Sequence, residues 1–192
     1  MASKPLTLGF DTSAAHCAAA LLRGDEILAT TAEDMGRGQA ENLMPLIEDM
    51  LSGADVTWPD LDRIGVGIGP GNFTGIRISV SAARGLALAL NIPAIGVSTF
   101  EAITQIDTKA TPAVPAPRDH VYVTHLGPDP QLLPIADAQK TASLTLPPAP
   151  RELAIAIAQV AATATPGASP APMYIKPADA APSRDVPPRI LT

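Results

Sequence analysis

A glycine-rich turn between two apolar segments constrains the fold of this chain more than any other feature. The preceding run, Ile64 to Ile68, is typical of a short buried strand. Gly69-Pro70-Gly71 must turn, because two glycines and a proline extend neither a strand nor a regular helix. Asn72 and Thr74 follow, and both are residue types that cap helix N-termini. The next residues, from about Gly75 to Leu90, are apolar nearly all round and predict a buried helix.

This turn has two interpretations. Free N–H groups at the start of a helix, together with the helix dipole, can bind an anion, and Gly69, Gly71 and Thr74 would then surround it. The same residues can also form a plain tight turn. No lysine stands where a Walker A loop requires one, and the third glycine of a dinucleotide fingerprint is missing.

Composition limits the class of protein. The chain of 192 residues has a net charge of −6, which argues against a protein that binds nucleic acid alone, although it does not exclude work on RNA within a complex. The single cysteine excludes an internal disulfide and fits a reducing compartment. Neither a signal-peptide pattern nor an uncharged apolar stretch of about 18 residues is found. A cytoplasmic protein without a membrane span is therefore expected.

The first half of the chain has the pattern of an α/β layer. Strands are predicted at residues 6–10, 18–22 and 27–31, the last two as a hairpin, and a helix at 39–51 with a kink at Pro45. Beyond the buried helix, residues 94–97 predict a strand, and Ser98 caps a helix that ends near Ile106. This order predicts a mixed sheet flanked by helices.

The composition changes near residue 108. Residues 111–192 hold 16 of the 21 prolines but two of the 14 glycines. We therefore divide the chain into a first lobe, 1–108, and a shortened, proline-rich second lobe with a tail, 109–192. The second lobe is predicted to contain strands at 121–124, 132–136 and 173–175, a helix at 151–162, and loops at 146–150 and 165–172.

Polar residues at the end of the first strand are candidates for a binding site. The carboxylate and two hydroxyls of Asp11-Thr12-Ser13 could face a phosphate or its Mg²⁺, but these residue types also cap β-turns routinely. His16 is expected in a turn, and Cys17 as a small core residue. His120 and His125 are five residues apart in a predicted strand, so they would point to opposite faces and share no metal.

Several blocks of this sequence resemble the TsaB family. The resemblance covers about residues 6–106, and its most specific part is Gly69-Pro70-Gly71-Asn72-Phe73-Thr74-Gly75-Ile76-Arg77. Further similar blocks are Gly9 to Ser13, Gln39 to Ile47, Arg84 to Ala87 and Ile95 to Thr99. The resemblance implies an actin-like (ASKHA, ribonuclease-H-like) fold of two lobes, with the second lobe reduced here.

The resemblance also implies a function. TsaB is needed to make threonylcarbamoyladenosine in tRNA and is a non-catalytic relative of the transferase TsaD. TsaB pairs with TsaD through first-lobe helices, the ATPase TsaE joins them, tRNA is contacted only indirectly, and a homodimer forms when TsaB is alone. The apolar arc of the helix at 39–51 is wide enough for an edge to meet a partner. The expected interface residues are Leu43, Met44, Ile47, Arg77, Ser81 and Arg84.

The sequence departs from the catalytic relative in two ways. Where the TsaD-like pattern has two metal-binding histidines, Thr99 and Ile103 stand here, and neither replaces an imidazole ligand. The second glycine-rich loop of the nucleotide pocket is also missing, because only Gly127 and Gly167 follow residue 110.

We therefore expect no catalytic residue, no metal and no required cofactor, with ATP or ADP at a subunit junction left open. The vestigial nucleotide residues would be Asp11, Thr12, Ser13, Gly69, Gly71 and Thr74. The alternatives are an active ASKHA-type phosphotransferase or metal-dependent hydrolase, and a stand-alone homodimeric binding protein.

Overall fold

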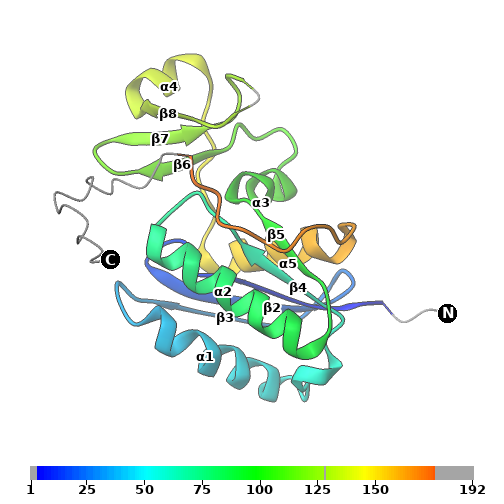
Figure 1. Ribbon diagram of the computed structural model, residues 1–192. Helices are drawn as coiled ribbons and strands as arrows, with labels where there is room; N and C mark the ends of the chain where they lie inside the picture. The colour runs from blue at the N-terminus through cyan, green and yellow to red at the C-terminus, as the bar shows by residue number, and fades with distance from the viewer. Residues whose placement is uncertain (1–3, 128, 176–192) are drawn as a thin grey trace, which may run out of the picture.

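The computed structural model describes residues 4–127 and 129–175 and has a mixed α/β architecture (Figure 1). Its main sheet has five strands in the order β3-β2-β1-β4-β5, antiparallel from β1 to β3 and parallel from β1 through β4 to β5. This confirms the predicted mixed sheet. The strands are β1 Leu6–Asp11, β2 His16–Arg23, β3 Glu26–Asp34, β4 Arg63–Gly67 and β5 Ala94–Val97.

Helices cover both faces of this sheet (Figure 1). α1 Gln39–Gly53 and α2 Phe73–Leu90 pack on one face, and α5 Pro150–Thr163 packs on the other, against β1, β2 and β4. α3 Thr99–Ile106 follows β5 and contacts α5, and the short η1 Trp58–Asp60 precedes β4.

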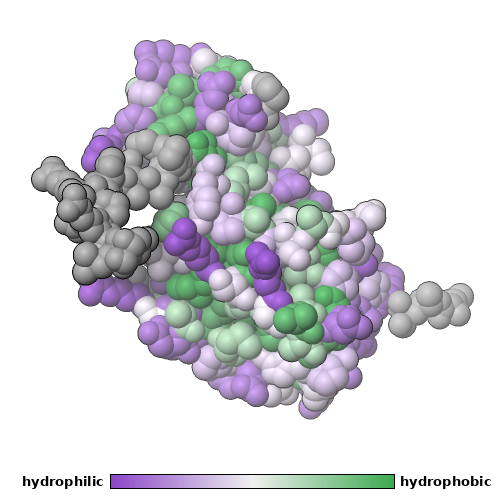
Figure 2. All heavy atoms as spheres, viewed as in Figure 1, coloured by the Kyte–Doolittle hydropathy of each residue, from purple (hydrophilic) through white to green (hydrophobic). Residues whose placement is uncertain are grey.

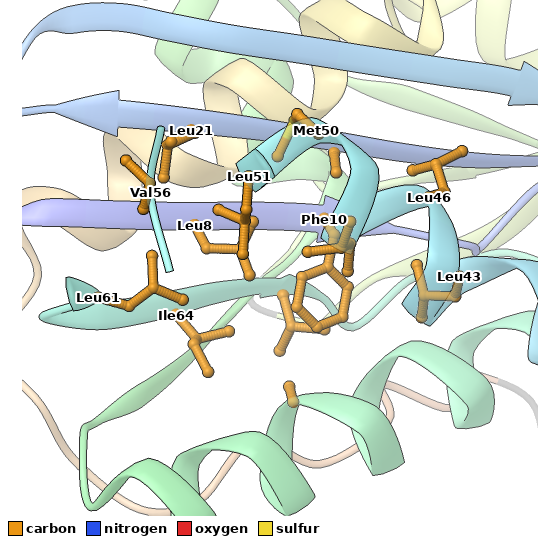
Figure 3. Packing of buried hydrophobic residues seen from close by; sticks show 14 of the residues in the cluster. Leu8, Phe10, Leu21, Leu43, Leu46, Met50, Leu51, Val56, Leu61 and Ile64 are labelled. Atoms are coloured by element: carbon orange, nitrogen blue, oxygen red, sulfur yellow. The ribbon is translucent and has the colours of Figure 1, made fainter. Parts of the chain in front are cut away.

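Successive side chains of β1 point alternately to these two faces of the sheet. Leu8 and Phe10 are fully buried in the core between the sheet and α1, together with residues of α1 such as Leu43 and Leu51 (Figure 3). Gly9 faces the opposite side, where a Cβ would come within 2.7 Å of Ala158 on α5. Gly65 on β4 would meet Ala161 of α5 in the same way. The two glycines therefore let an alanine-rich helix approach the sheet closely.

This placement of α5 bears on the division into lobes. α5 lies beyond residue 108, yet it covers the main sheet, and the Arg63 Nη1 group donates to the carbonyl oxygens of Ala161, Ala162 and Ala164 at its C-terminal end. The division at residue 108 stays a prediction.

α2 differs from its prediction as a helix buried on all sides. Its buried residues are Gly75, Ile76, Ser79, Val80 and Ala83, whereas Leu88 is 85% exposed. The expectation was wrong because β4 and α1 cover only one side of the helix. Among the described helices, α2 alone is long and apolar enough to cross a membrane, which is weak evidence, because core helices meet the same criterion.

A second, three-stranded sheet lies above the first (Figure 1). It consists of β6 Ala113–Ala116, β7 His120–Val123 and β8 Gln131–Pro134, followed by α4 Ile135–Thr141. The predicted strand at 121–124 is confirmed. The sequence did not predict β6, because Pro115 argues against a strand; β6 pairs only with β7, so it is an edge strand, where proline is tolerated.

Two other predictions for the second half differ from the structure. The strand predicted at 132–136 is present as β8, but it ends at Pro134, and Ile135 begins α4. Residues 173–175 form no strand, although the Met173 N–H donates to the Ile68 carbonyl oxygen, 2.8 Å away.

Candidate functional site

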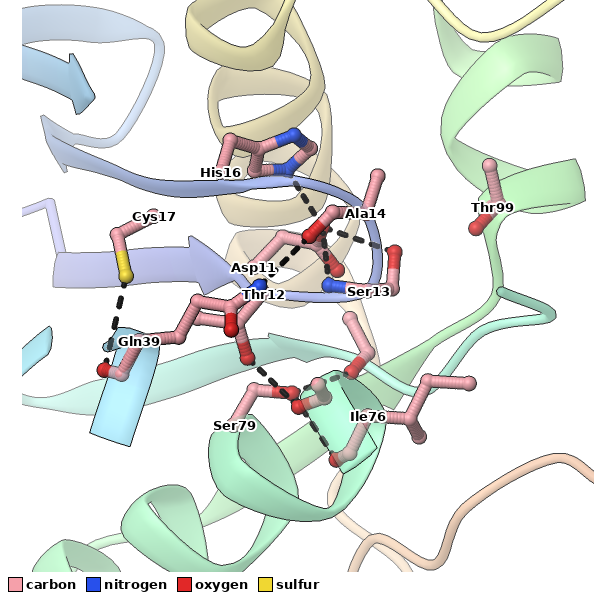
Figure 4. Close-up of polar contacts among 12 residues, drawn as sticks. Asp11, Thr12, Ser13, Ala14, His16, Cys17, Gln39, Ile76, Ser79 and Thr99 are labelled. Atoms are coloured by element: carbon pink, nitrogen blue, oxygen red, sulfur yellow. Dashed lines mark hydrogen bonds and ion pairs between the residues drawn. The ribbon is translucent and has the colours of Figure 1, made fainter. Parts of the chain in front are cut away.

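The carboxylate of Asp11, at the end of β1, is the centre of a buried polar cluster. Its Oδ2 accepts hydrogen bonds from the Ser13 backbone N–H at 2.9 Å and from the Ser13 hydroxyl at 2.9 Å, and lies 2.8 Å from the Nε2 atom of His16 (Figure 4). Its Oδ1 is buried without a partner among the described residues and faces Gly67, where any side chain would collide with it. Asp11 is therefore held in one orientation by the turn that follows it.

His16 is not the turn residue that the sequence predicted. It is the first residue of β2, and its side chain is 8% exposed and paired with Asp11. Because the Asp11 Oδ2 atom already accepts from Ser13, the proton of the pair is best placed on Nε2, which then donates. The sequence did not predict this pair, although an aspartate and a histidine stand on either side of a short turn between two apolar strands.

The glycine turn lies beside this cluster. The Asn72 N–H donates to the Ser13 carbonyl oxygen at 2.6 Å, the Thr12 hydroxyl donates to the Gly75 carbonyl oxygen at 2.7 Å, and the Thr99 N–H donates to the Gly69 carbonyl oxygen at 2.9 Å. The structure thus brings Asp11, Thr12, Ser13, Gly69 and Gly71 together. It places Thr74 elsewhere, beside α1, and nucleotide binding by these residues stays a prediction.

A cavity of about 560 Å³ opens above the cluster, between the two sheets. Ser13, His16, Asn72 and Thr99 supply its polar side, and Val114, Tyr122 and proline residues line the rest. This location, at the carboxyl ends of parallel strands, is where ligands bind in open α/β sheets.

The described residues show no group of three His, Cys, Asp or Glu side chains that could hold a metal ion. Ile103, at one position of the absent histidine pair, is 2% exposed and packs with Phe100 and Val114. His120 and His125 have separate partners, the Arg118 carbonyl oxygen and the Thr141 hydroxyl.

Cys17 is a core residue, as predicted. It is fully buried, and burial, aided by the negative charges of Glu33 and Asp11, raises the pKa of its thiol to about 11. The thiol is therefore protonated near neutral pH, whereas a nucleophilic cysteine needs the thiolate form.

A groove of about 470 Å³ runs between α1 and α2. Leu43, Met44, Arg77 and Ser81 line it, as do Phe73 and Ile78. Hydrophobic residues are exposed over this part of the surface, between hydrophilic side chains (Figure 2).

Two of the predicted interface residues lie outside this groove. Ile47 is fully buried in the core, so its side chain is not exposed to a partner. Arg84 lines a neighbouring groove together with Leu88.

At one end of the α1–α2 groove, two aromatic rings surround Arg77. Its guanidinium carbon lies 3.8 Å from the centre of the Phe73 ring, and its Nε atom donates to the Tyr174 hydroxyl at 2.8 Å. Arg77 was predicted as an interface residue, which stays a prediction; its contact with Tyr174, 97 residues away, was not predicted.

Comparison with known proteins identifies similar sequences and structures. Residues 30–146 match the family TsaD, tRNA N6-adenosine threonylcarbamoyltransferase. The chain is 35% identical over 98 residues to the tRNA threonylcarbamoyladenosine biosynthesis protein TsaB of Escherichia coli, covering 51% of this chain and 42% of that protein. It is 34% identical over 119 residues to TsaB of Bacillus subtilis, covering 60% and 52%. The chain thus spans about half the length of the curated relatives it matches.

Two solved structures are also similar. YeaZ from Pseudomonas aeruginosa aligns with a TM-score of 0.58 at 30% identity, covering 68% of this chain and 67% of that one. An uncharacterized protein from the same organism, described as similar to the peptidase YeaZ, aligns with a TM-score of 0.73, covering 90% of this chain and all of that one. At 23% identity, the second match shows the fold alone.

Proposed function

Because this chain belongs to the TsaB family, within the wider TsaD family, we propose that it acts in the biosynthesis of threonylcarbamoyladenosine in tRNA. Its role is that of a non-catalytic, cytoplasmic subunit that pairs with a TsaD-type transferase. A TsaE-type ATPase joins the pair, tRNA is reached only through the complex, and the chain forms a homodimer when its partner is absent. No cofactor is required for this role.

The observation that carries the proposal is the uncovered face of α1 and α2. α2 buries one side only, and the groove beside it combines the flexible side chain of Met44 with the ring of Phe73, which is 38% exposed. Methionine and aromatic residues are enriched at protein interfaces. An apolar groove of this kind, rimmed by Arg77, fits a helix of a second subunit.

The proposed pairing is tested by co-expression with the TsaD-type protein of the same organism. We expect one complex to elute from size exclusion. Its molar mass, measured by light scattering, should equal the sum of both chains. Separate elution of the two proteins at concentrations of about 10 μM, where an interface of standard size holds partners together, would contradict the pairing.

The isolated chain is expected to show no metal-dependent transferase or hydrolase activity and negligible ATP turnover. The reason is chemical: Ile103 offers no donor atom, and the Thr99 hydroxyl is a weak ligand beside an imidazole. Metal analysis of the purified chain and an ATPase assay check this. Stoichiometric bound iron or zinc, with activity that a chelator abolishes, would support the alternative of an active enzyme.

A further inference from the structure

The cavity between the two sheets has no part in the proposed pairing, and its lining is chemically selective. None of the described residues that line it is a lysine, an arginine, an aspartate or a glutamate. Most of its surface comes from apolar groups, including Val114, Leu153 and Pro148. Its volume of about 560 Å³ lies within the usual range for small-molecule sites.

The helix N-termini beside the cavity do not form a phosphate site. The cap of α2 is internal, because the Asn72 side chain accepts from the Gly75 N–H. α3 carries its own carboxylate, since Glu101 accepts from both the backbone N–H and the hydroxyl of Ser98. α5 begins with Pro150, which has no N–H to donate. A polyphosphate would find no cationic side chain in the lining.

Two side chains on the polar side of the cavity, Ser13 and His16, offer acceptors, beside the donor-capable groups of Asn72, Thr99 and Tyr122. In the neutral imidazole with Nε2 donating to Asp11, the Nδ1 atom of His16 is an acceptor without a partner among the described residues, on a side chain that is more than nine-tenths buried. Figure 4 shows the second ring nitrogen of His16 on the edge that faces away from Asp11. Ser13 gives its hydroxyl proton to Asp11, so the lone pairs of its oxygen are also available.

From this arrangement we propose that the cavity is a binding site for an uncharged, mostly apolar or aromatic small molecule with a hydrogen-bond-donating group, an N–H or O–H. The donor reaches Nδ1 of His16, and the apolar body lies against the proline-rich wall. Asp11 acts through His16 as a positioning residue, because it fixes which ring nitrogen carries the proton. Phosphate esters and carboxylates are disfavoured, since no cationic side chain lines the cavity to offset the cost of burying their charge.

Indole and 1-methylindole are matched probes, because they share an aromatic body and differ in the ring N–H. Each is titrated into the ¹⁵N-labelled protein, and the amide shifts of residues 11–17 and of Thr99 are followed. We expect indole to bind roughly tenfold more tightly than 1-methylindole, as one hydrogen bond predicts. Mg·ATP, titrated separately, is expected to leave these amides unshifted.

Two variants test the location and the contact. Ala116→Trp on β6 fills the cavity without touching the Asp11–His16 pair and should abolish binding of both probes, whereas Ser52→Trp on the exposed surface of α1 should not. His16→Phe keeps an aromatic ring and should abolish the preference for indole.

Several results would overturn the proposal. These are equal affinities for the two probes, no saturable shift with indole, shifts outside the cavity, or tighter binding of Mg·ATP at the same amides. If His16→Phe does not fold, the probe pair on the wild-type chain still decides the chemistry, and Ala116→Trp still decides the place.

Discussion

Gly71→Val is expected to destabilise the fold by roughly 2–4 kcal/mol, because a side chain there overpacks the turn and breaks a hydrogen bond. A Cβ atom on Gly71 would overlap the carbonyl oxygen of Ser13, which accepts from the Asn72 N–H at the start of α2. The change would thus separate the Asp11 turn from the α2 N-terminus. In a chain of this size, such a loss lowers the melting temperature by roughly 4–16 °C.

Gly71 is not required for a left-handed backbone, which is the usual reason for a glycine in a turn. In this loop the positive φ belongs to Gly69, at 93°, and Gly71 is needed for close approach rather than for a left-handed backbone. Gly85→Val on α2 is the matched control, because nothing lies within 4 Å of a Cβ there and valine is a better helix former than glycine. Thermal unfolding followed by circular dichroism compares the two. A Gly71→Val protein that melts with the wild type would show that the Ser13 contact tolerates a side chain.

Met44→Glu is expected to leave the subunit folded and to weaken pairing at least tenfold, with the TsaD-type partner or with a second copy. Met44 is half-buried at the α1–α2 groove, so a carboxylate there reaches water in the free subunit but would lose that water among apolar groups in the complex. Moving a charged group from water into an interface costs several kcal/mol of binding free energy, either as desolvation of the charge or as the protonation that removes it. Sedimentation with and without partner measures the effect.

Asn42→Glu is the control for the added charge, since Asn42 is exposed on the same helix and does not line the groove. It should pair as the wild type does. If Met44→Glu is folded and also pairs normally, Met44 is not at the interface. If it unfolds, the groove belongs to the core of one subunit, and the neighbouring surface at Arg84 and Leu88 becomes the place to look for the partner.

The sequence alone predicted the elements whose signals are local. The strands at 6–10, 18–22 and 64–68 follow from short apolar runs bounded by turn residues, and the capping roles of Asn72 and Ser98 follow from their position before an apolar segment. The helix at 151–162 was found for the same reason. The family resemblance depended on the same segments, because most of its blocks lie at turns and helix starts.

Only the tertiary structure decided which of these surfaces meet. That α5 covers the main sheet depends on Gly9 and Gly65, which lie about a hundred or more residues before it, and no periodicity within α5 contains that information. The exposed side of α2 could not be predicted either. The sequence of an apolar helix shows which side chains can be buried, but not how many sides of the helix other elements cover. The Asp11–His16 pair exists because β1 and β2 are antiparallel strands joined by a short turn. The turn brings the two polar side chains, five residues apart in the sequence, into contact below the surface. Local patterns determine elements, whereas burial and pairing depend on contacts between residues far apart in the chain.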